Sequence, residues 1–171
     1  MWRSIVAAAI ALAALAAVHR VVVVPWRCNV LAGRVSASTE RAWLDRGGDR
    51  ARAAATNNIA ILGDCADRCR TDVNLAMLLS SNFRLLNRNS VAAGLLEEAL
   101  RYERRPKLYF ELGDTQLELG LREEALKNFV RAGNFAGTYN FGEIADPDVR
   151  ERAYAAVGRH EEELLARQGT R

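Results

Sequence analysis

A repeat with a period of thirty-three residues constrains the fold of this chain most strongly. The segment AMLLSSNFRLLNRNSVAAGLLEEAL, from Ala76, aligns with YFELGDTQLELGLREEALKNFVRAG, from Tyr109. Each segment places apolar residues at helical spacing on both sides of a short polar break. A period of this length with two helices per unit predicts stacked helical hairpins, in which neighbouring units bury each other's apolar faces. The expected fold class is therefore all-α.

Small residues in the second segment fit this arrangement. Glycine costs about 1 kcal/mol relative to alanine inside a helix, so Gly113 needs a structural reason. We expect Gly113 and Ala125 at the close crossing of the two helices of one unit, with Phe129 filling the space beside them. Gly120 belongs in the turn between the helices, where glycine adopts a conformation that most residues avoid. Ala132 is expected to face the next unit.

The second unit resembles the tetratricopeptide repeat, a helix–turn–helix unit of solenoid proteins. The positions that carry the resemblance are Tyr109, Leu112, Gly113, Gly120, Ala125, Phe129 and Ala132. The unit departs from the family at Gln116, where an aromatic residue is usual, and at Gly137, where proline usually closes the unit. The resemblance covers residues 73–137, with a more degenerate first unit, and implies a protein-binding scaffold.

The chain divides into four expected parts: a transmembrane anchor or signal segment at 1–27, an irregular helical pair or degenerate repeat at 28–72, two repeats at 73–137, and a loop with a C-terminal capping helix at 138–171. The capping helix is predicted to begin at Asp146 and Pro147, since proline suits the first helical position. Val149, Ala153 and Val157 then face inward.

The N-terminal segment is predicted to be an uncleaved single-pass anchor. The apolar run from Ile5 to Val18 spans only about 21 Å as a helix, but Ile5 to Trp26 spans about 33 Å, enough to cross a bilayer. Arg20 can extend to the headgroups, and tryptophan favours that layer. Two alternatives remain: a cleaved signal peptide with a site near Ala14–Ala16, or a buried core helix.

Two features of the sequence favour opposite sides of the membrane for the domain. Arg3 lies before the apolar run, whereas Arg20, Arg27 and Arg34 lie within or after it. Counting these charges would keep the C-terminal side in the cytoplasm. A short basic head before an apolar run, however, is how exported proteins begin. We expect a bacterial inner-membrane protein with its soluble domain in the periplasm rather than the cytoplasm.

A partner-binding groove is predicted on the concave face formed by the first helix of each unit. By repeat position this face presents Asn74, Met77, Ser81, Arg84, Lys107, Phe110, Asp114 and Leu117. Exposed side chains of Met77, Phe110 and Leu117 would form an apolar stripe for an extended or helical segment of a protein. The alternative is that the capping helix or the N-terminal helix of the chain fills the groove.

Three cysteines raise the question of a disulfide. Cys65 and Cys69 are four residues apart, and a bridge between them would need distortion at the helix end. The first interpretation is therefore two small buried apolar residues, and a Cys65–Cys69 disulfide is the alternative if the domain is exported. Zinc would require more ligands than the neighbourhood offers, so we expect no metal site.

No motif for catalysis or for a cofactor appears in the sequence. The two histidines are isolated, and no HExxH, G-x-S-x-G, Walker or Rossmann pattern occurs. Charges of both signs are interspersed, with a net charge of +3, so nucleic-acid binding is not expected. The one basic cluster, Arg101 to Lys107, falls where a helix should end, and there it complements the helix dipole.

These features predict a membrane-anchored adaptor without enzymatic activity that binds a protein partner. By its resemblance, the chain would help in bacterial envelope or polysaccharide assembly. The alternatives are a soluble cytosolic scaffold of tetratricopeptide repeats and an accessory subunit of a membrane enzyme complex.

Overall fold

The structure is a computed structural model that describes residues 2–69, 71–138 and 140–169; Met1, Arg70, Tyr139, Thr170 and Arg171 lie outside the described residues. Within those ranges the regular elements are all helical and no strand occurs, which confirms the all-α prediction. In chain order they are α1 (Trp2–Val18), η1 (His19–Val23), α2 (Val24–Leu44), α3 (Asp49–Arg68), α4 (Val73–Leu85), α5 (Asn89–Tyr102), α6 (Pro106–Glu118), α7 (Arg122–Ala136), η2 (Phe141–Glu143) and α8 (Pro147–Gly169).

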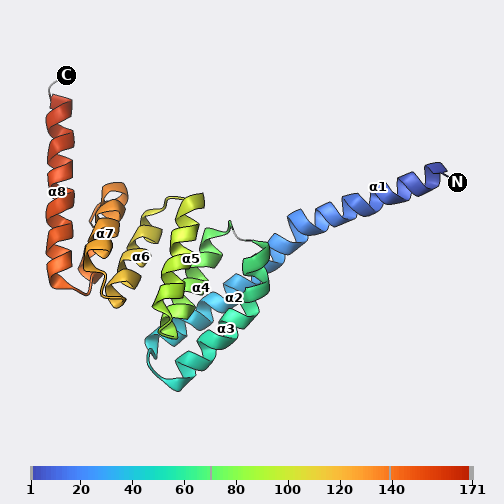
Figure 1. Cartoon of the computed structure of the whole chain (residues 1–171), viewed down its shortest axis with the longest axis horizontal. Coiled ribbons are helices and arrows are strands. Elements are labelled where there is room, and N and C mark those ends of the chain that lie inside the picture. Colours follow the sequence, from blue (N-terminus) through green and yellow to red (C-terminus); the bar gives the residue numbers. More distant parts are fainter. Residues whose placement is uncertain (1, 70, 139, 170–171) are drawn as a thin grey trace.

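The N-terminal elements α1, η1 and α2 form one uninterrupted helical rod, and α1 projects away from the other helices (Figure 1). The part of the rod from Ala8 onward is long and apolar enough to cross a membrane. Its side chains are open, as at Leu12, Leu15 and Val21, which are 68%, 67% and 71% exposed. The alternative of a buried core helix is therefore wrong for this stretch.

The boundary expected after residue 27 is not a break in the backbone, because α2 begins at Val24 and runs through it to Leu44. The expected irregular pair at 28–72 contains two regular helices, α2 and α3, which pack against each other in opposite directions (Figure 1). The apolar residues Val24, Cys28, Leu31 and Val35 recur at helical spacing along α2 and pack in one core, so its regularity was readable from the sequence.

Two further antiparallel hairpins, α4 with α5 and α6 with α7, follow beside the first pair (Figure 1). Both bounds of α6 (Pro106–Glu118) lie thirty-three positions after those of α4 (Val73–Leu85). α7 likewise begins thirty-three positions after α5. The predicted spacing of two helical hairpins is therefore present in the backbone.

The turns within these two hairpins are also built alike. Asn87 and Gly120 occupy the same position in their turns, and both have positive φ angles, 58° and 78°. The next residues, Arg88 and Leu121, each donate their N–H to the carbonyl five positions earlier. Such bonds satisfy carbonyls that the helix end would leave unpaired. The prediction that Gly120 supplies a left-handed turn is confirmed.

The crossing of α6 and α7 explains the glycine in the middle of α6. A Cβ atom added at Gly113 would lie 2.8 Å from a ring carbon of Phe129, closer than carbon atoms approach without repulsion. Phe129 and Ala125 are both fully buried at this crossing. The prediction that Gly113 marks a close helix contact is confirmed.

α8 packs against α7 and begins where the sequence predicts. The Asp146 carboxylate accepts hydrogen bonds from the N–H groups of Asp148 and Val149, which caps the first turn. Ala153 and Val157 are buried on the inward face, as expected.

The alternative pairing of Cys65 with Cys69 is wrong, and so is the interpretation of both as unbridged, since the structure joins Cys28 to Cys65 and leaves Cys69 as a free thiol. Opposite directions of α2 and α3 bring the start of one helix beside the end of the other, and the two Cα atoms are 5.5 Å apart. Cys69 still donates its N–H to the Cys65 carbonyl. The helix is therefore undistorted at the point where the predicted bridge would have required distortion.

Candidate functional site

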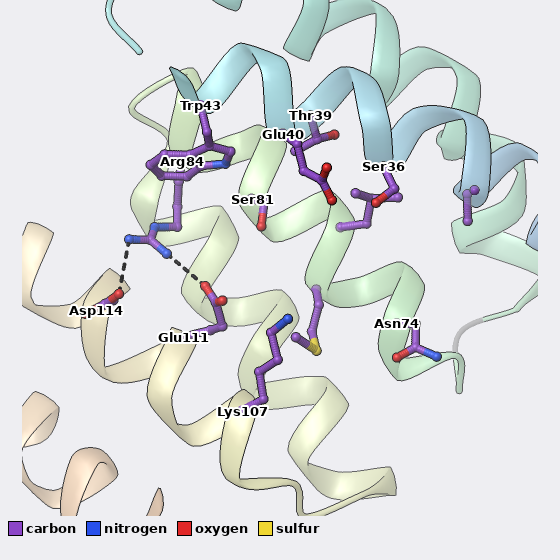
Figure 2. A pocket seen from close by; sticks show the side chains of 14 residues that line it. Ser36, Thr39, Glu40, Trp43, Asn74, Ser81, Arg84, Lys107, Glu111 and Asp114 are labelled. Carbon is purple, nitrogen blue, oxygen red and sulfur yellow. Dashed lines mark hydrogen bonds and ion pairs between the residues drawn. The ribbon is translucent and has the colours of Figure 1, made fainter. Parts of the chain in front are cut away.

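An open cavity of about 610 Å³ lies along the face that α2, α4 and α6 share (Figure 2). Its lining residues are Ala32, Gly33, Ser36, Thr39, Glu40 and Trp43 of α2, Asn74, Met77, Leu78, Ser81 and Arg84 of α4, and Lys107, Glu111 and Asp114 of α6.

Each of these helices contributes one face to the cavity. Residues three and four positions apart lie on the same side of a helix. On α4 these steps connect Asn74, Met77, Ser81 and Arg84, and the same steps connect the lining residues of α2 and α6. The cavity therefore follows from the parallel placement of three helices, each being the first of an antiparallel pair.

A buried arginine organises one end of the cavity. The Arg84 Nη1 donates to Oε2 of Glu111 at 3.0 Å, and Nη2 donates to Oε1 of Glu118 at 3.1 Å. Nη2 also lies 3.9 Å from Oδ2 of Asp114. The guanidinium sits 5.1 Å from the centre of the Trp43 ring (Figure 2), a favourable cation–π arrangement. This side chain thereby links α4 to both α2 and α6.

The three carboxylates do not share this cation equally. Burial raises the pKa of Glu118, but hydrogen bonds from Arg84 and Arg46 outweigh it, so the pKa is lowered. For Asp114, burial raises the pKa to about 6, because the attraction of Arg84 offsets only part of the desolvation and Glu111 and Glu118 add repulsion. Burial lowers the pKa of Arg84, but the Glu118 hydrogen bond and the surrounding charges leave it raised.

A buried polar triad joins α2, α3 and α4, and one of its members, Thr39, also lines the cavity. Asn58 donates from its amide nitrogen to Oδ1 of Asn82 at 2.9 Å and to Oγ1 of Thr39 at 3.2 Å. Asn82 donates to the same Thr39 oxygen at 2.9 Å, and Thr39 donates to the Val35 carbonyl. Hydrogen bonds of this kind satisfy polar atoms that would otherwise be costly to bury. The triad fixes the relative positions of the three helices.

No protein-family model, curated protein or solved structure matches this chain. Its site is therefore described from its own residues.

Six of the eight residues predicted for the groove line the cavity: Asn74, Met77, Ser81, Arg84, Lys107 and Asp114. The other two do not. Phe110 is 8% exposed and packs edge to face on Phe129 with ring centres 5.2 Å apart. Leu117 packs against the same core. The apolar stripe of Met77, Phe110 and Leu117 is thus wrong as predicted, and only Met77 faces the cavity.

Phe110 is buried because it packs against Phe129 of α7. The core to which both rings belong extends to Phe141 of η2 and Val149 of α8, which follow the last hairpin. Phe110 lines only a smaller adjoining cavity of about 300 Å³ between α6, α7 and η2. At Phe110 the predicted groove is therefore closed by α7 and bordered by η2.

Sequence reasoning missed the wall that α2 provides. Gly33, Ser36, Glu40 and Trp43 recur at steps of three, four and three residues, which is the signal that could have found them. Glu111 was also missed, although it lies one turn from Lys107 on α6. In the described ranges, no group of three or more His, Cys, Asp or Glu side chains is placed to hold a metal ion.

Proposed function

We propose that this protein is a membrane-anchored adaptor that holds a segment of a partner protein in the cavity between α2, α4 and α6. The observation that carries this proposal is the convergence of three helix faces on one open cavity, while α3, α5 and α7 pack behind them (Figure 1). The side chains that face the cavity combine hydroxyl, amide, thioether and charged groups. Such a mixture suits a polypeptide segment, which presents main-chain and side-chain groups together.

The proposal includes a relation to tetratricopeptide repeats. It is supported by the thirty-three-residue offset between equivalent helix bounds and by the positive φ angles at Asn87 and Gly120. In this interpretation the α2–α3 pair is a further, divergent unit, and α8 caps the open end of the stack. The terminal unit of such a stack needs a cap because it has no neighbour to bury its apolar face.

The proposed location is the periplasmic side of a bacterial inner membrane, where the adaptor would serve envelope assembly. The Cys28–Cys65 disulfide supports an exported domain, because disulfides persist in oxidising compartments and are rare in the cytoplasm. The apolar rod from Ala8 supports anchoring. Carbonate extraction should leave the full-length chain in the membrane pellet, and a soluble product that starts near Ala17 would contradict anchoring.

The adaptor role is tested by photocrosslinking in native membranes. A photoreactive residue replaces Met77 in the full-length chain, and the cavity is filled in a second variant by Gly33→Trp. A Cβ atom added at Gly33 would meet no atom within 4 Å, so the new side chain begins in open space on the cavity lining. Gly94→Trp on α5 is the matched control, because Gly94 is also unobstructed but lies away from the cavity.

We expect one discrete crosslinked protein with the Met77 probe, loss of that product in Gly33→Trp, and its retention in Gly94→Trp. An equal yield from all three chains, or the same product from a probe placed at Gly94, would show that the cavity is not the binding surface.

A further inference from the structure

The charges around the cavity do not balance. The first cavity and the smaller one beside it are both lined by Lys107, Glu111 and Asp114 of α6. Glu40 of α2 adds a carboxylate to the first cavity, and Glu143 of η2 adds one to the second. Four carboxylates therefore face one lysine and one arginine along this continuous surface.

The arginine is already committed within the protein. Arg84 is 6% exposed, is hydrogen-bonded to Glu111 and Glu118, and lies over the Trp43 ring. It cannot turn toward an incoming anion without losing contacts that compensate its own burial. The surface offered to a partner is consequently more acidic than the simple count of charges indicates.

Asp114 is the most weakly paired of the three carboxylates around Arg84. Its contact with Arg84 is long at 3.9 Å. Burial is the largest cause of its raised pKa, and Glu111, Glu118 and Glu143 all raise the pKa further by repulsion. A cation placed beside Asp114 would relieve this repulsion and favour the ionised carboxylate.

The rest of the lining suits a polypeptide better than a small cation. Asn74 accepts a hydrogen bond from Arg105 through its carbonyl oxygen at 3.0 Å, which leaves its amide N–H groups to donate. Ser36 and Ser81 add hydroxyl groups (Figure 2). Met77 adds an apolar contact. A metal ion would make no use of the apolar surface or of a volume of about 610 Å³, and a polyamine carries no acceptor for the Asn74 N–H groups.

We propose that the occupant of the cavity is an extended segment of a partner protein that places a lysine or arginine side chain against the carboxylates of Glu40, Glu111 and Asp114. This inference rests on the proposed adaptor function and specifies the chemistry of its partner.

The test uses a displayed library of random nine-residue peptides, selected on the full-length protein in lipid nanodiscs. Peptides that depend on the cavity are those that bind wild type and Gly94→Trp but not Gly33→Trp. Their sequences should be enriched in lysine or arginine at one position. A recovered peptide should bind Asp114→Asn and Glu40→Gln more weakly, by about tenfold where a charge-assisted hydrogen bond is lost. Glu40 is exposed on α2, so Glu40→Gln should not disturb folding. It can therefore test the inference even if Asp114→Asn folds poorly.

A pH series adds a second measurement. For wild type, the affinity for a recovered lysine peptide should fall about tenfold between pH 7.5 and 5, as Asp114 becomes protonated around its pKa of about 6. The affinity of Asp114→Asn should change little over the same range.

Cavity-dependent peptides without a cationic preference would overturn this inference and leave the adaptor function standing. The absence of any cavity-dependent peptide would overturn both proposals. Spermidine, tested alone on the same nanodiscs, provides a third arm: its binding to wild type, lost in Asp114→Asn, together with no peptide selection, would identify a small cation as the occupant.

Discussion

At the scale of single residues, Arg84 is the side chain on which most of the cavity depends. It contacts the Trp43 ring on one side and carboxylates of α6 on the other. Each interaction at a protein surface contributes little when it is isolated. Here the guanidinium is buried and its partners are shared, so the loss of one group leaves several others uncompensated.

Arg84→Ala should therefore destabilise the fold. We expect a loss of about 2–4 kcal/mol in the free energy of unfolding, below the upper range for buried ion pairs because the carboxylates keep some contact with water. Their side chains are 21% to 28% exposed. Arg84→Lys, which keeps the charge but not the forked geometry, should lose less. Chemical denaturation measures the free energy of unfolding of both variants. An Arg84→Ala protein as stable as wild type would contradict the role described for Arg84.

Asp114 should make the protein less stable as pH rises from 4 to 6.5. Its pKa is raised from the ordinary 3.8 to about 6 in the folded state, so the folded protein binds this proton more tightly than the unfolded chain. The resulting stabilisation is fully present below about pH 4 and is lost as pH rises through about 6. Above that pH, Asp114→Asn should be more stable than wild type by about 1–2 kcal/mol.

The measurement for Asp114 is the difference in unfolding free energy between the two proteins across this pH range. Glu118 has a lowered pKa and favours folding more at higher pH, but it is present in both proteins and cancels in the difference. A difference that stays constant with pH would mean that Asp114 has an ordinary pKa.

At the scale of helices, the crossing of α6 and α7 provides a sharp comparison between two glycines. Gly113→Ala would place a Cβ atom 2.8 Å from the Phe129 ring, and we expect a cost of about 1–3 kcal/mol from overpacking. Gly94→Ala in α5 meets no atom within 4 Å, so the better helix propensity of alanine should stabilise it by up to about 1 kcal/mol. Thermal melting of both variants should give shifts of opposite sign.

The helices that the sequence predicts well are those of the thirty-three-residue repeat, where two aligned segments support the same pattern. The hairpins of residues 73–137 appear with the predicted offset, and six predicted groove residues line one cavity, because helical spacing decides which side chains share a face. Residues 28–44 were not predicted to form a regular helix along one side of the cavity. Their face toward the cavity is made of small and polar residues such as Gly33 and Ser36, which give no apolar signal.

Contacts between distant segments account for the remaining errors. Phe110 was expected to be exposed on the concave face, but it packs against Phe129 of α7 in a core that extends to η2 and α8, and no local pattern reports that packing. Cys28 and Cys65 are thirty-seven residues apart and meet only because α2 and α3 run in opposite directions. The Thr39–Asn58–Asn82 triad joins three helices in the same way. The spacing of residues along the sequence predicts which side chains share a helix face. These contacts between helices depend instead on how the helices pack against one another.

At the scale of the whole molecule, the disulfide ties the first helix of the cavity wall to the next helix in the chain. Denatured but unreduced protein should have one thiol open to maleimide, Cys69, and all three cysteines should react after reduction. Cys28→Ser and Cys65→Ser should each lower stability by about 2–4 kcal/mol, as expected for closure of a loop of this length. Cys69→Ser should not share this loss, and equal losses for all three variants would contradict the pairing.

Because α1, η1 and α2 form one uninterrupted helix, the direction in which the cavity opens is fixed around the axis of the N-terminal rod. A helix turns by about 100° and advances 1.5 Å with every residue, and α2 is itself one wall of the cavity. One residue added to the rod would swing the opening through roughly a quarter of a circle, whereas seven would return it almost to its starting direction. The number of residues in the rod therefore sets the direction in which the cavity opens. A partner held by the same membrane would reach the cavity from that direction.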